Sequence, residues 1–160
     1  MVDFPKLLRV LSQEGVEFII VGGAAAAAHG ASRLTNDLDL VYRRSPENHL
    51  RLVKALLPFS PYLRDAPEGL PFKWDTRTIG MGLNFTLITT MGSLDLLGEI
   101  TGGGKYEDLL PFCEKIQVFE IECYCLGLKK LIEVKRAAGR PKDFDAIAEL
   151  ETLWEEKREK

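Results

Sequence analysis

The chain contains little cysteine and little histidine. Its three cysteines, Cys113, Cys123 and Cys125, are an odd set without the spacing of a disulfide framework, which favours a reducing compartment. The two histidines, His29 and His49, do not complete a recognisable zinc-ligand spacing with them. We therefore expect Cys123 and Cys125, which alternate within IECYCLG, to be buried, small apolar side chains, and the protein to be cytoplasmic.

The sequence also lacks an apolar run long enough to cross a bilayer. The segment FIIVGGAAAAA, residues 18–28, is shorter than the ~20 residues that a spanning helix needs. Acidic residues precede it, and no basic segment typical of a signal peptide does. We expect neither a membrane segment nor a membrane partner.

There is no excess of positive charge. The formal net charge is -3, so binding to nucleic acid through overall charge is not expected. The basic residues do gather locally, because six of them fall within residues 129–142. The length of 160 residues suits a single domain with a proper core. We expect one domain over 1–160, with C-terminal helices (127–158) packed on a sheet.

Hydrophobic periodicity predicts the elements. We expect a helix from Phe4 capped by Asp3, a helix from Pro46 capped by Ser45, and a loop over 58–71. Helical segments are further predicted over 23–30, over 127–139 and from near Pro141 onward. Strands are predicted over 16–22, 36–43, 72–80, 83–90 and 93–97, with one bent strand or two short ones over 115–126.

This order predicts an α/β (α+β) fold, in which helices pack on a mixed β-sheet. The first segments alternate between strand and helix, whereas the later strands are expected to be antiparallel neighbours. We expect two helices to bury apolar faces made of Leu50, Val53 and Leu57, and of Phe144, Ile147, Leu150 and Trp154.

Two aspartates interrupt an apolar strand in NDLDLVY. Residues two apart in a strand point to the same side, so Asp37 and Asp39 are expected side by side while Leu38 and Leu40 face the core. Adjacent carboxylates repel each other, and a divalent cation such as magnesium removes that conflict. A solvent-facing strand with two polar residues is the plainer alternative.

Two further features strengthen the metal interpretation. Gly22 and Gly23 lie where a strand turns into a helix, where glycine permits close approach of a ligand and free N–H groups suit a phosphate. Asp95 lies between two leucines in GSLDLLGEI, and an acid in apolar surroundings is costly without a partner. Three converging acids would form a two-metal site for in-line phosphoryl chemistry.

The glycine pair, the DLDL motif thirteen residues later and the subsequent LDL resemble the nucleotidyltransferase superfamily typified by DNA polymerase beta. VGGAAAAAHGASRLTNDLDL and LIEVKRAAGRPKDFDAIAEL are similar to the AbiEii/MenA-type toxin branch. The resemblance spans Val16 to Leu150. The glycine pair replaces the Gly-Ser that is more frequent in the superfamily, so a serine hydroxyl contact to phosphate is missing here.

The resemblance implies roles for individual residues. Gly22 and Gly23 would hold the nucleotide phosphates, while Asp37, Asp39 and Asp95 would bind two magnesium or manganese ions, with Asp95 also activating the acceptor hydroxyl. Four further residues are nucleotide-binding candidates: Arg33, Thr35, Lys135 and Arg140. For Lys135 and Arg140 the plainer alternative is a basic side chain near a helix end, and for Arg33 and Thr35 it is stabilisation of a turn.

These features together predict an enzyme that transfers a nucleoside monophosphate from an NTP to a hydroxyl and releases pyrophosphate. The branch resemblance implies a tRNA or protein acceptor, and a toxin restrained by an antitoxin protein. A non-catalytic nucleotide- or partner-binding module on the same fold is the alternative, although such a module has little need for Asp95. A DxD glycosyltransferase is a third interpretation, which the short chain and the glycine pair oppose.

Overall fold

A computed structural model describes residues 3–32, 35–67 and 69–159 of the chain. Its helices are α1 Phe4–Gln13, α2 Gly22–Ala28, α3 Pro46–Leu56, α4 Thr76–Met81, α5 Tyr106–Leu109, α6 Leu128–Ala138 and α7 Pro141–Arg158. Its strands are β1 Phe18–Val21, β2 Leu38–Tyr42, β3 Tyr62–Leu63, β4 Asn84–Thr89, β5 Gly92–Leu97, β6 Glu99–Ile100, β7 Gly104–Lys105, β8 Cys113–Val118 and β9 Ile121–Leu126.

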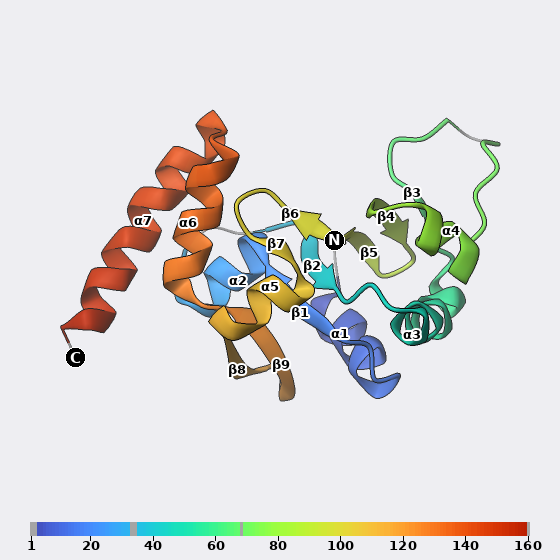
Figure 1. Cartoon of the computed structure of the whole chain (residues 1–160), viewed down its shortest axis with the longest axis horizontal. Coiled ribbons are helices and arrows are strands. Elements are labelled where there is room, and N and C mark those ends of the chain that lie inside the picture. Colours follow the sequence, from blue (N-terminus) through green and yellow to red (C-terminus); the bar gives the residue numbers. More distant parts are fainter. Residues whose placement is uncertain (1–2, 33–34, 68, 160) are drawn as a thin grey trace.

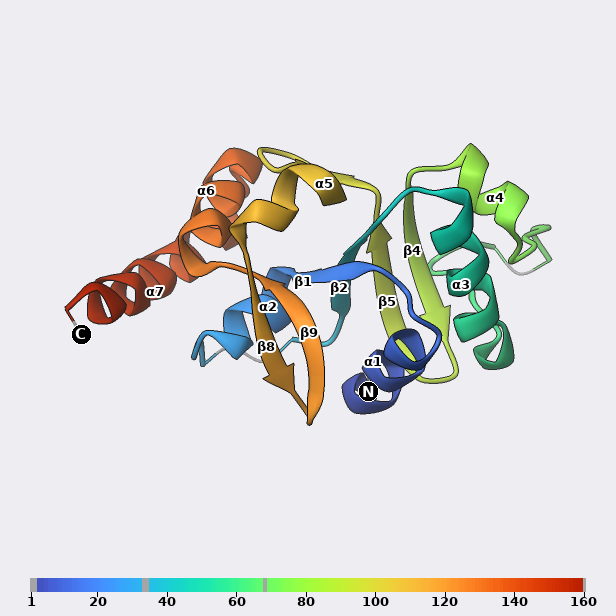
Figure 2. The same cartoon turned by 60° about the horizontal axis from the view of Figure 1, so that its bottom comes forward.

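A mixed sheet forms the centre of the molecule (Figures 1 and 2). The order of its seven described strands is β3-β4-β5-β2-β1-β9-β8, and β6 and β7 form a separate hairpin. The β2–β5 and β1–β9 pairs are parallel, whereas β1–β2, β3–β4, β4–β5 and β8–β9 are antiparallel. The predicted fold class, helices packed on a mixed sheet, is confirmed.

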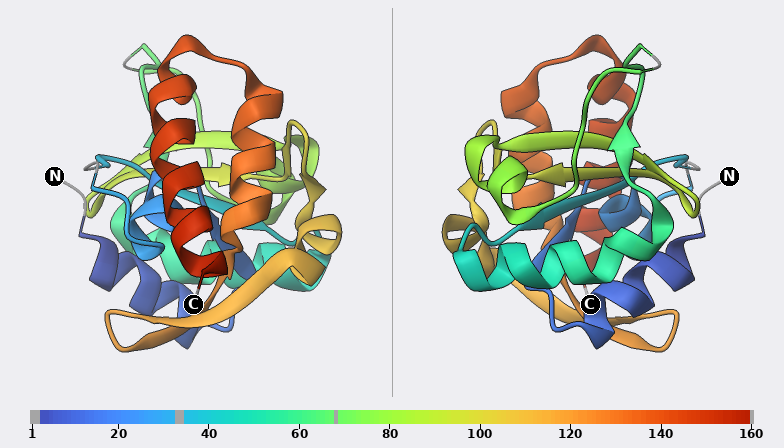
Figure 3. Two further views of the ribbon diagram at one scale, coloured as in Figure 1. Left: turned by 90° about the vertical axis from the view of Figure 1, so that its left-hand side faces the viewer. Right: turned by 90° about the vertical axis from the view of Figure 1, so that its right-hand side faces the viewer.

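The helices form two groups around this sheet. α1 packs against α3, whereas α6 packs against α7 on one side and α2 on the other. Figure 3 shows α6 and α7 standing side by side, and Figure 1 shows this pair at the opposite end of the molecule from α3. Leu131 and Leu150 are nearly inaccessible to solvent, so both C-terminal helices contribute to the core.

The buried face of α3 differs from the predicted one. Leu50 and Leu57 are about half exposed, at 49% and 58%, while Leu52 and Leu56 are fully buried. The helix is rotated because Asn48 turns inward, where its side chain accepts from the Glu17 N–H and donates to the carbonyls of Glu17 and Arg43. A buried amide that satisfies so many backbone groups fixes the phase of the helix.

Three other local predictions were wrong. Residues 72–80 do not form a strand: α4 occupies 76–81, because the Asp75 side chain caps it by accepting from the Thr78 N–H at 2.8 Å. The predicted 58–71 loop contains β3, which pairs with β4. Phe144 was expected inside but is 61% exposed, whereas Ile147 and Leu150 are buried as predicted.

The second half of the chain largely matches the sequence patterns. The segment 115–126 falls in two strands, β8 and β9, joined in a hairpin. Cys123 and Cys125 are buried on β9, as expected of small apolar side chains. α6 ends at Gly139, whose φ of 63° suits a glycine cap. Within the described residues, no helix combines the length and apolarity that a membrane crossing requires.

Candidate functional site

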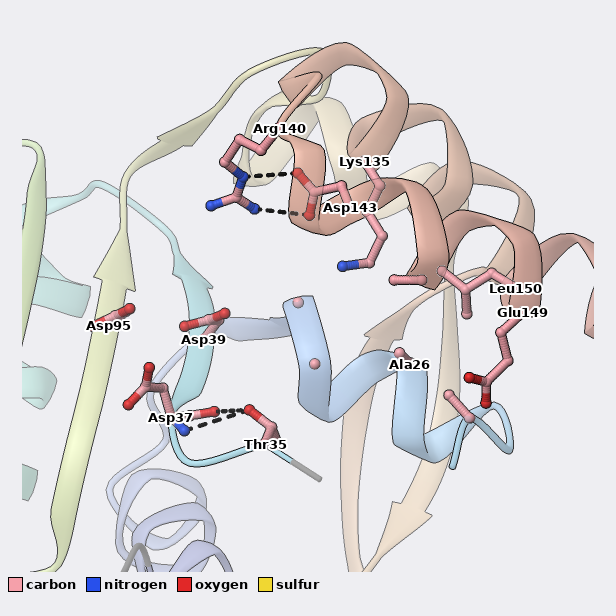
Figure 4. A pocket seen from close by; sticks show the side chains of 14 residues that line it. Ala26, Thr35, Asp37, Asp39, Asp95, Lys135, Arg140, Asp143, Glu149 and Leu150 are labelled. Atoms are coloured by element: carbon pink, nitrogen blue, oxygen red, sulfur yellow. Dashed lines mark hydrogen bonds and ion pairs between the residues drawn. The ribbon is translucent and has the colours of Figure 1, made fainter. Parts of the chain in front are cut away.

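Two of the three predicted acids lie directly opposite each other on neighbouring strands. β2 and β5 run parallel, with Asp39 paired to Asp95. The flanking leucines Leu38 and Leu94 are fully buried, so both carboxyl groups point to the other side of the sheet. Asp37 lies just before β2, and Figure 4 shows its carboxyl group near the other two. The predicted convergence of the three acids is therefore present.

Asp39 is held in an unfavourable environment for a charged carboxylate. Burial raises its pKa from 3.8 to about 7, and hydrogen bonding and repulsion from Asp95 and repulsion from Asp37 act in the same direction. The positive charge of Lys135 opposes this rise. When Asp39 is ionised, its buried Oδ1 has no hydrogen-bond donor among the described residues. Among the described residues, no donor therefore stabilises the negative charge on this oxygen.

Arg64 is a site residue that the sequence analysis missed. Its guanidinium donates to Asp95 Oδ1 at 2.7 Å and to Asp37 Oδ1 at 3.4 Å. Arg64 follows β3, and its own N–H donates to the Thr86 carbonyl on β4, so the antiparallel pairing of these strands delivers it. Only 23% of its side chain is exposed. Its single positive charge reduces the repulsion between these two carboxylates.

The glycine pair closely approaches the acid strand. Gly22 has a φ of 63°, and a Cβ there would lie 2.3 Å from Asp39 Oδ2. A Cβ at Gly23 would lie 2.9 Å from Thr35 Oγ1. Thr35 in turn donates to the Asp37 carbonyl at 2.9 Å. The side chains of this turn thus fit around the glycines. Arg33, the remaining candidate residue of this segment, lies outside the described residues.

The predicted basic residues approach from the other side. Lys135 on α6 and Arg140 between α6 and α7 both line the cavity above the acids (Figure 4). The Arg140 guanidinium is clamped by Asp143, with Nε to Oδ2 at 2.8 Å and Nη2 to Oδ1 at 3.2 Å. Burial acts to raise the pKa of Asp143, but the hydrogen bonds and charge of Arg140, with the charge of Lys135, lower it overall. Asp143 therefore positions Arg140 toward the site.

Two cavities meet at this cluster. The first has a volume of about 380 Å³ and the second about 410 Å³, each within the size range of small-molecule sites. Both are lined by Gly22, Asp39, Asp95, Lys135 and Arg140. Every described candidate residue lines at least the first cavity.

The residues present fit a hard divalent cation. Carboxylate oxygens are the donors that magnesium prefers, and the unpartnered, buried Asp39 Oδ1 is one of them. Among the described residues, no three acidic, histidine or cysteine side chains already form a closed metal-binding group. Asp37 and Asp95 are instead each paired with the Arg64 guanidinium.

Comparison with known proteins identifies the architecture. No protein-family model and no curated protein matches the chain. Among solved structures, it is similar to TM1012 from Thermotoga maritima, a proposed nucleotidyltransferase, with a TM-score of 0.52 and 15% identity over 100% of this chain and 97% of that one. It is also similar to the antibiotic-resistance factor ANT(2'')-Ia, with a TM-score of 0.55 and 14% identity over 96% of this chain and 88% of that one.

The chain has the nucleotidyltransferase fold. The similarity extends over nearly the whole length of this chain and most of both solved structures. The fold predicted from GG, DLDL and LDL is therefore confirmed. In this nucleotidyltransferase fold, the acid cluster lies at the centre of the sheet, on β2 and β5.

Proposed function

We propose that the protein is a metal-dependent nucleotidyltransferase that moves a nucleoside monophosphate from an NTP to an acceptor hydroxyl. One observation carries the proposal: three carboxylates converge beside a glycine pair on one side and two basic side chains on the other. This arrangement supplies metal ligands, a close approach for phosphates and positive charge for a triphosphate. The nucleotidyltransferase fold of the chain is consistent with it.

In the proposed reaction, the acceptor oxygen forms a bond to the α-phosphorus of the NTP. The bond between that phosphorus and the α–β bridging oxygen breaks, and pyrophosphate leaves with the bonding electron pair. The hydroxyl proton passes to the Asp95 carboxylate. Lys135 and Arg140 hold the triphosphate, and Asp143 keeps the Arg140 guanidinium oriented toward it.

Asp37, Asp39 and Asp95 would hold two magnesium or manganese ions. Such ions, when bound, neutralise the triphosphate and stabilise the attacking and leaving oxygens. Arg64 must then give up part of its contact with Asp37 and Asp95, because both carboxylates are needed as ligands. The orphaned Oδ1 of Asp39 is the oxygen with the most to gain from a cation.

The proposal extends to the biological role. A tRNA or protein hydroxyl is the acceptor, and an antitoxin protein restrains a toxic activity, as the resemblance of the VGGAAAAAHGASRLTNDLDL segment to the AbiEii/MenA-type branch implies. Growth arrest on expression of the parent, but not of Asp39→Asn, would support the toxin role. Normal growth with both would contradict it.

The first test is ligand-dependent melting. Magnesium with an NTP should raise the melting temperature more than either alone, since ligands that bind only the native state stabilise it. Glu114→Gln, at an exposed carboxylate on β8, is the matched control for Asp39→Asn. Only the Asp39 variant should lose the joint shift. If no NTP shifts melting with magnesium or manganese, the proposed function is wrong.

The second test seeks the reaction itself. Each α-labelled NTP is incubated with the protein, magnesium and a cell extract, and the labelled product is digested with protease or ribonuclease. Transfer by the parent and by Glu114→Gln, but not by Asp39→Asn, is the expected result. Equal labelling by the parent and Asp39→Asn would show that the acids are not needed.

A further inference from the structure

The second cavity has a different character from the first. Seven residues line the second cavity alone, and six of them are aliphatic: Val21, Leu97, Ile100, Leu131, Val134 and Ala138, with Thr101 as the seventh. None of these seven is aromatic or charged. The first cavity instead adds polar groups, among them Thr35, Asp37 and Asp143.

The β6–β7 hairpin forms one wall of this second cavity. Ile100 and Thr101 lie on it, and it packs on α6 so closely that a Cβ at Gly102 would lie 2.3 Å from the Ala137 Cβ. Gly102 also has a φ of 77°, a conformation that favours glycine. The glycine-rich segment 101–104 is thus a packed structural element. It holds an aliphatic wall in place opposite α6.

The position of the cavities assigns a substrate to each. In-line displacement requires the attacking and leaving oxygens to lie on opposite sides of the phosphorus. Gly23 and Asp37 line only the first cavity, so the NTP lies there with its phosphates at the shared acids. The attacking hydroxyl must then enter from the second cavity, past Asp39 and Asp95.

We infer that the second cavity receives a protein acceptor, a serine or threonine side chain with an aliphatic neighbour in the peptide. This rests on the proposed function and narrows its acceptor. Proteins hold exposed nucleobases by stacking them on aromatic rings or arginine planes. Among the described residues that line this cavity, Arg140 alone has such a plane, and its guanidinium is held by Asp143 and shared with the first cavity. Aliphatic walls, in contrast, bind aliphatic side chains.

Methyl NMR titration of the full-length protein tests the inference. The probes are N-acetyl-Thr-Leu-amide, N-acetyl-Thr-Gly-amide and the dinucleotide CpA, each added with magnesium and a non-hydrolysable NTP. The Thr-Leu probe should shift the methyl signals of Ile100 and Val134, and should bind at least about tenfold more tightly than Thr-Gly, because it buries a leucine side chain.

Two tryptophan variants locate the binding. Ala138 lines only the second cavity and Ala146 only the first, and both lie on helices. Ala138→Trp should weaken Thr-Leu binding at least about tenfold and leave NTP affinity unchanged. Ala146→Trp should do the reverse. The NTP titration checks the proposed function separately, because absence of NTP binding by the parent would reject that function first.

Other results overturn the inference. If CpA shifts the Ile100 and Val134 methyl signals and competes with Thr-Leu, the acceptor is a nucleic acid. If Thr-Leu and Thr-Gly bind equally, or if Ala138→Trp leaves Thr-Leu binding intact while NTP still binds, the aliphatic wall does not select the acceptor.

Discussion

The Arg64 guanidinium donates to Asp95 Oδ1 at 2.7 Å, from a segment that lies 31 residues earlier in the chain. Together with its contact to Asp37, this pairing places one positive charge beside two of the three carboxylates of the site. A divalent cation bound as proposed would therefore compete with Arg64 for the same two carboxylates.

Replacing Arg64 should therefore lower the stability of the metal-free protein and increase the stabilisation by a divalent metal. In metal-free buffer, Arg64→Gln should lose about 1–3 kcal/mol of stability, as expected for hydrogen bonds to charged groups. Manganese should stabilise this variant more than the parent, because no guanidinium has to be displaced. Arg51→Gln, at an arginine paired with Glu17 at 3.4 Å, is the control. Equal manganese-induced shifts in melting temperature for all three proteins would contradict the competition.

The raised pKa of Asp39 predicts a pH-dependent stability. The folded protein holds a proton on Asp39 up to about pH 7, whereas the unfolded chain loses it near pH 3.8. Stability should therefore fall as the pH rises through this window. In chelator-treated buffer above pH 7, Asp39→Asn should be more stable than the parent by up to about 4 kcal/mol, because each unit of pKa shift corresponds to about 1.4 kcal/mol. The difference should disappear near pH 4 in urea unfolding. If the stability of the parent and of Asp39→Asn depends on pH in the same way, the pKa of Asp39 is not raised in the folded protein.

Asp95 distinguishes an enzyme from a binding module. In the proposed reaction, the interaction of Asp95 with the attacking oxygen would exist mainly in the transition state. Asp95→Asn should therefore lower transfer at least ~100-fold, the low end for loss of one electrostatic stabiliser, with little change in magnesium–NTP affinity. Asp37→Asn should impair both, and Glu114→Gln neither. Parental transfer by Asp95→Asn would show that this acid is structural, and the proposed triad would be wrong.

Gly22 tests the close approach between the glycine turn and the acid strand. Gly22→Ala adds a Cβ 2.3 Å from Asp39 Oδ2 and should displace that carboxylate. Manganese should then fail to raise the melting temperature. Gly15→Ala is the matched control, since Gly15 has a similar φ of 73° but its Cβ would meet only Arg51 Cδ at 3.9 Å. If manganese changes the melting temperature of both variants equally, Gly22→Ala acts through backbone strain and not through displacement of Asp39.

The acids could be predicted from the sequence because each breaks an apolar strand pattern. Asp39 and Asp95 each lie between leucines, and alternation puts them on the side opposite the core. Their pairing could not be predicted, because the register of two strands distant in sequence depends on tertiary packing. Arg64 could not be predicted as a site residue, because it follows a two-residue strand within a proline-containing segment and no local sequence pattern marks it.

The wrong helix and strand assignments have similar causes. Asp75 three residues before Thr78 is a capping pattern that the strand prediction over 72–80 overlooked. The phase of α3 could not be read from its leucines, because Asn48 rather than Leu50 turns inward. A buried polar residue with backbone partners in other segments reveals itself only in three dimensions.

The pairing of β2 with β5 makes the alignment of the acids depend on the buried leucines beside them. A slip of one residue between these strands would turn an acid toward the core and a leucine toward the substrate. Burial of the opposite face opposes that slip, through four leucines on the core side of the two strands: Leu38, Leu40, Leu94 and Leu96. Polar substitution of these leucines should therefore disturb the alignment of the acids, although it removes none of the carboxylates themselves.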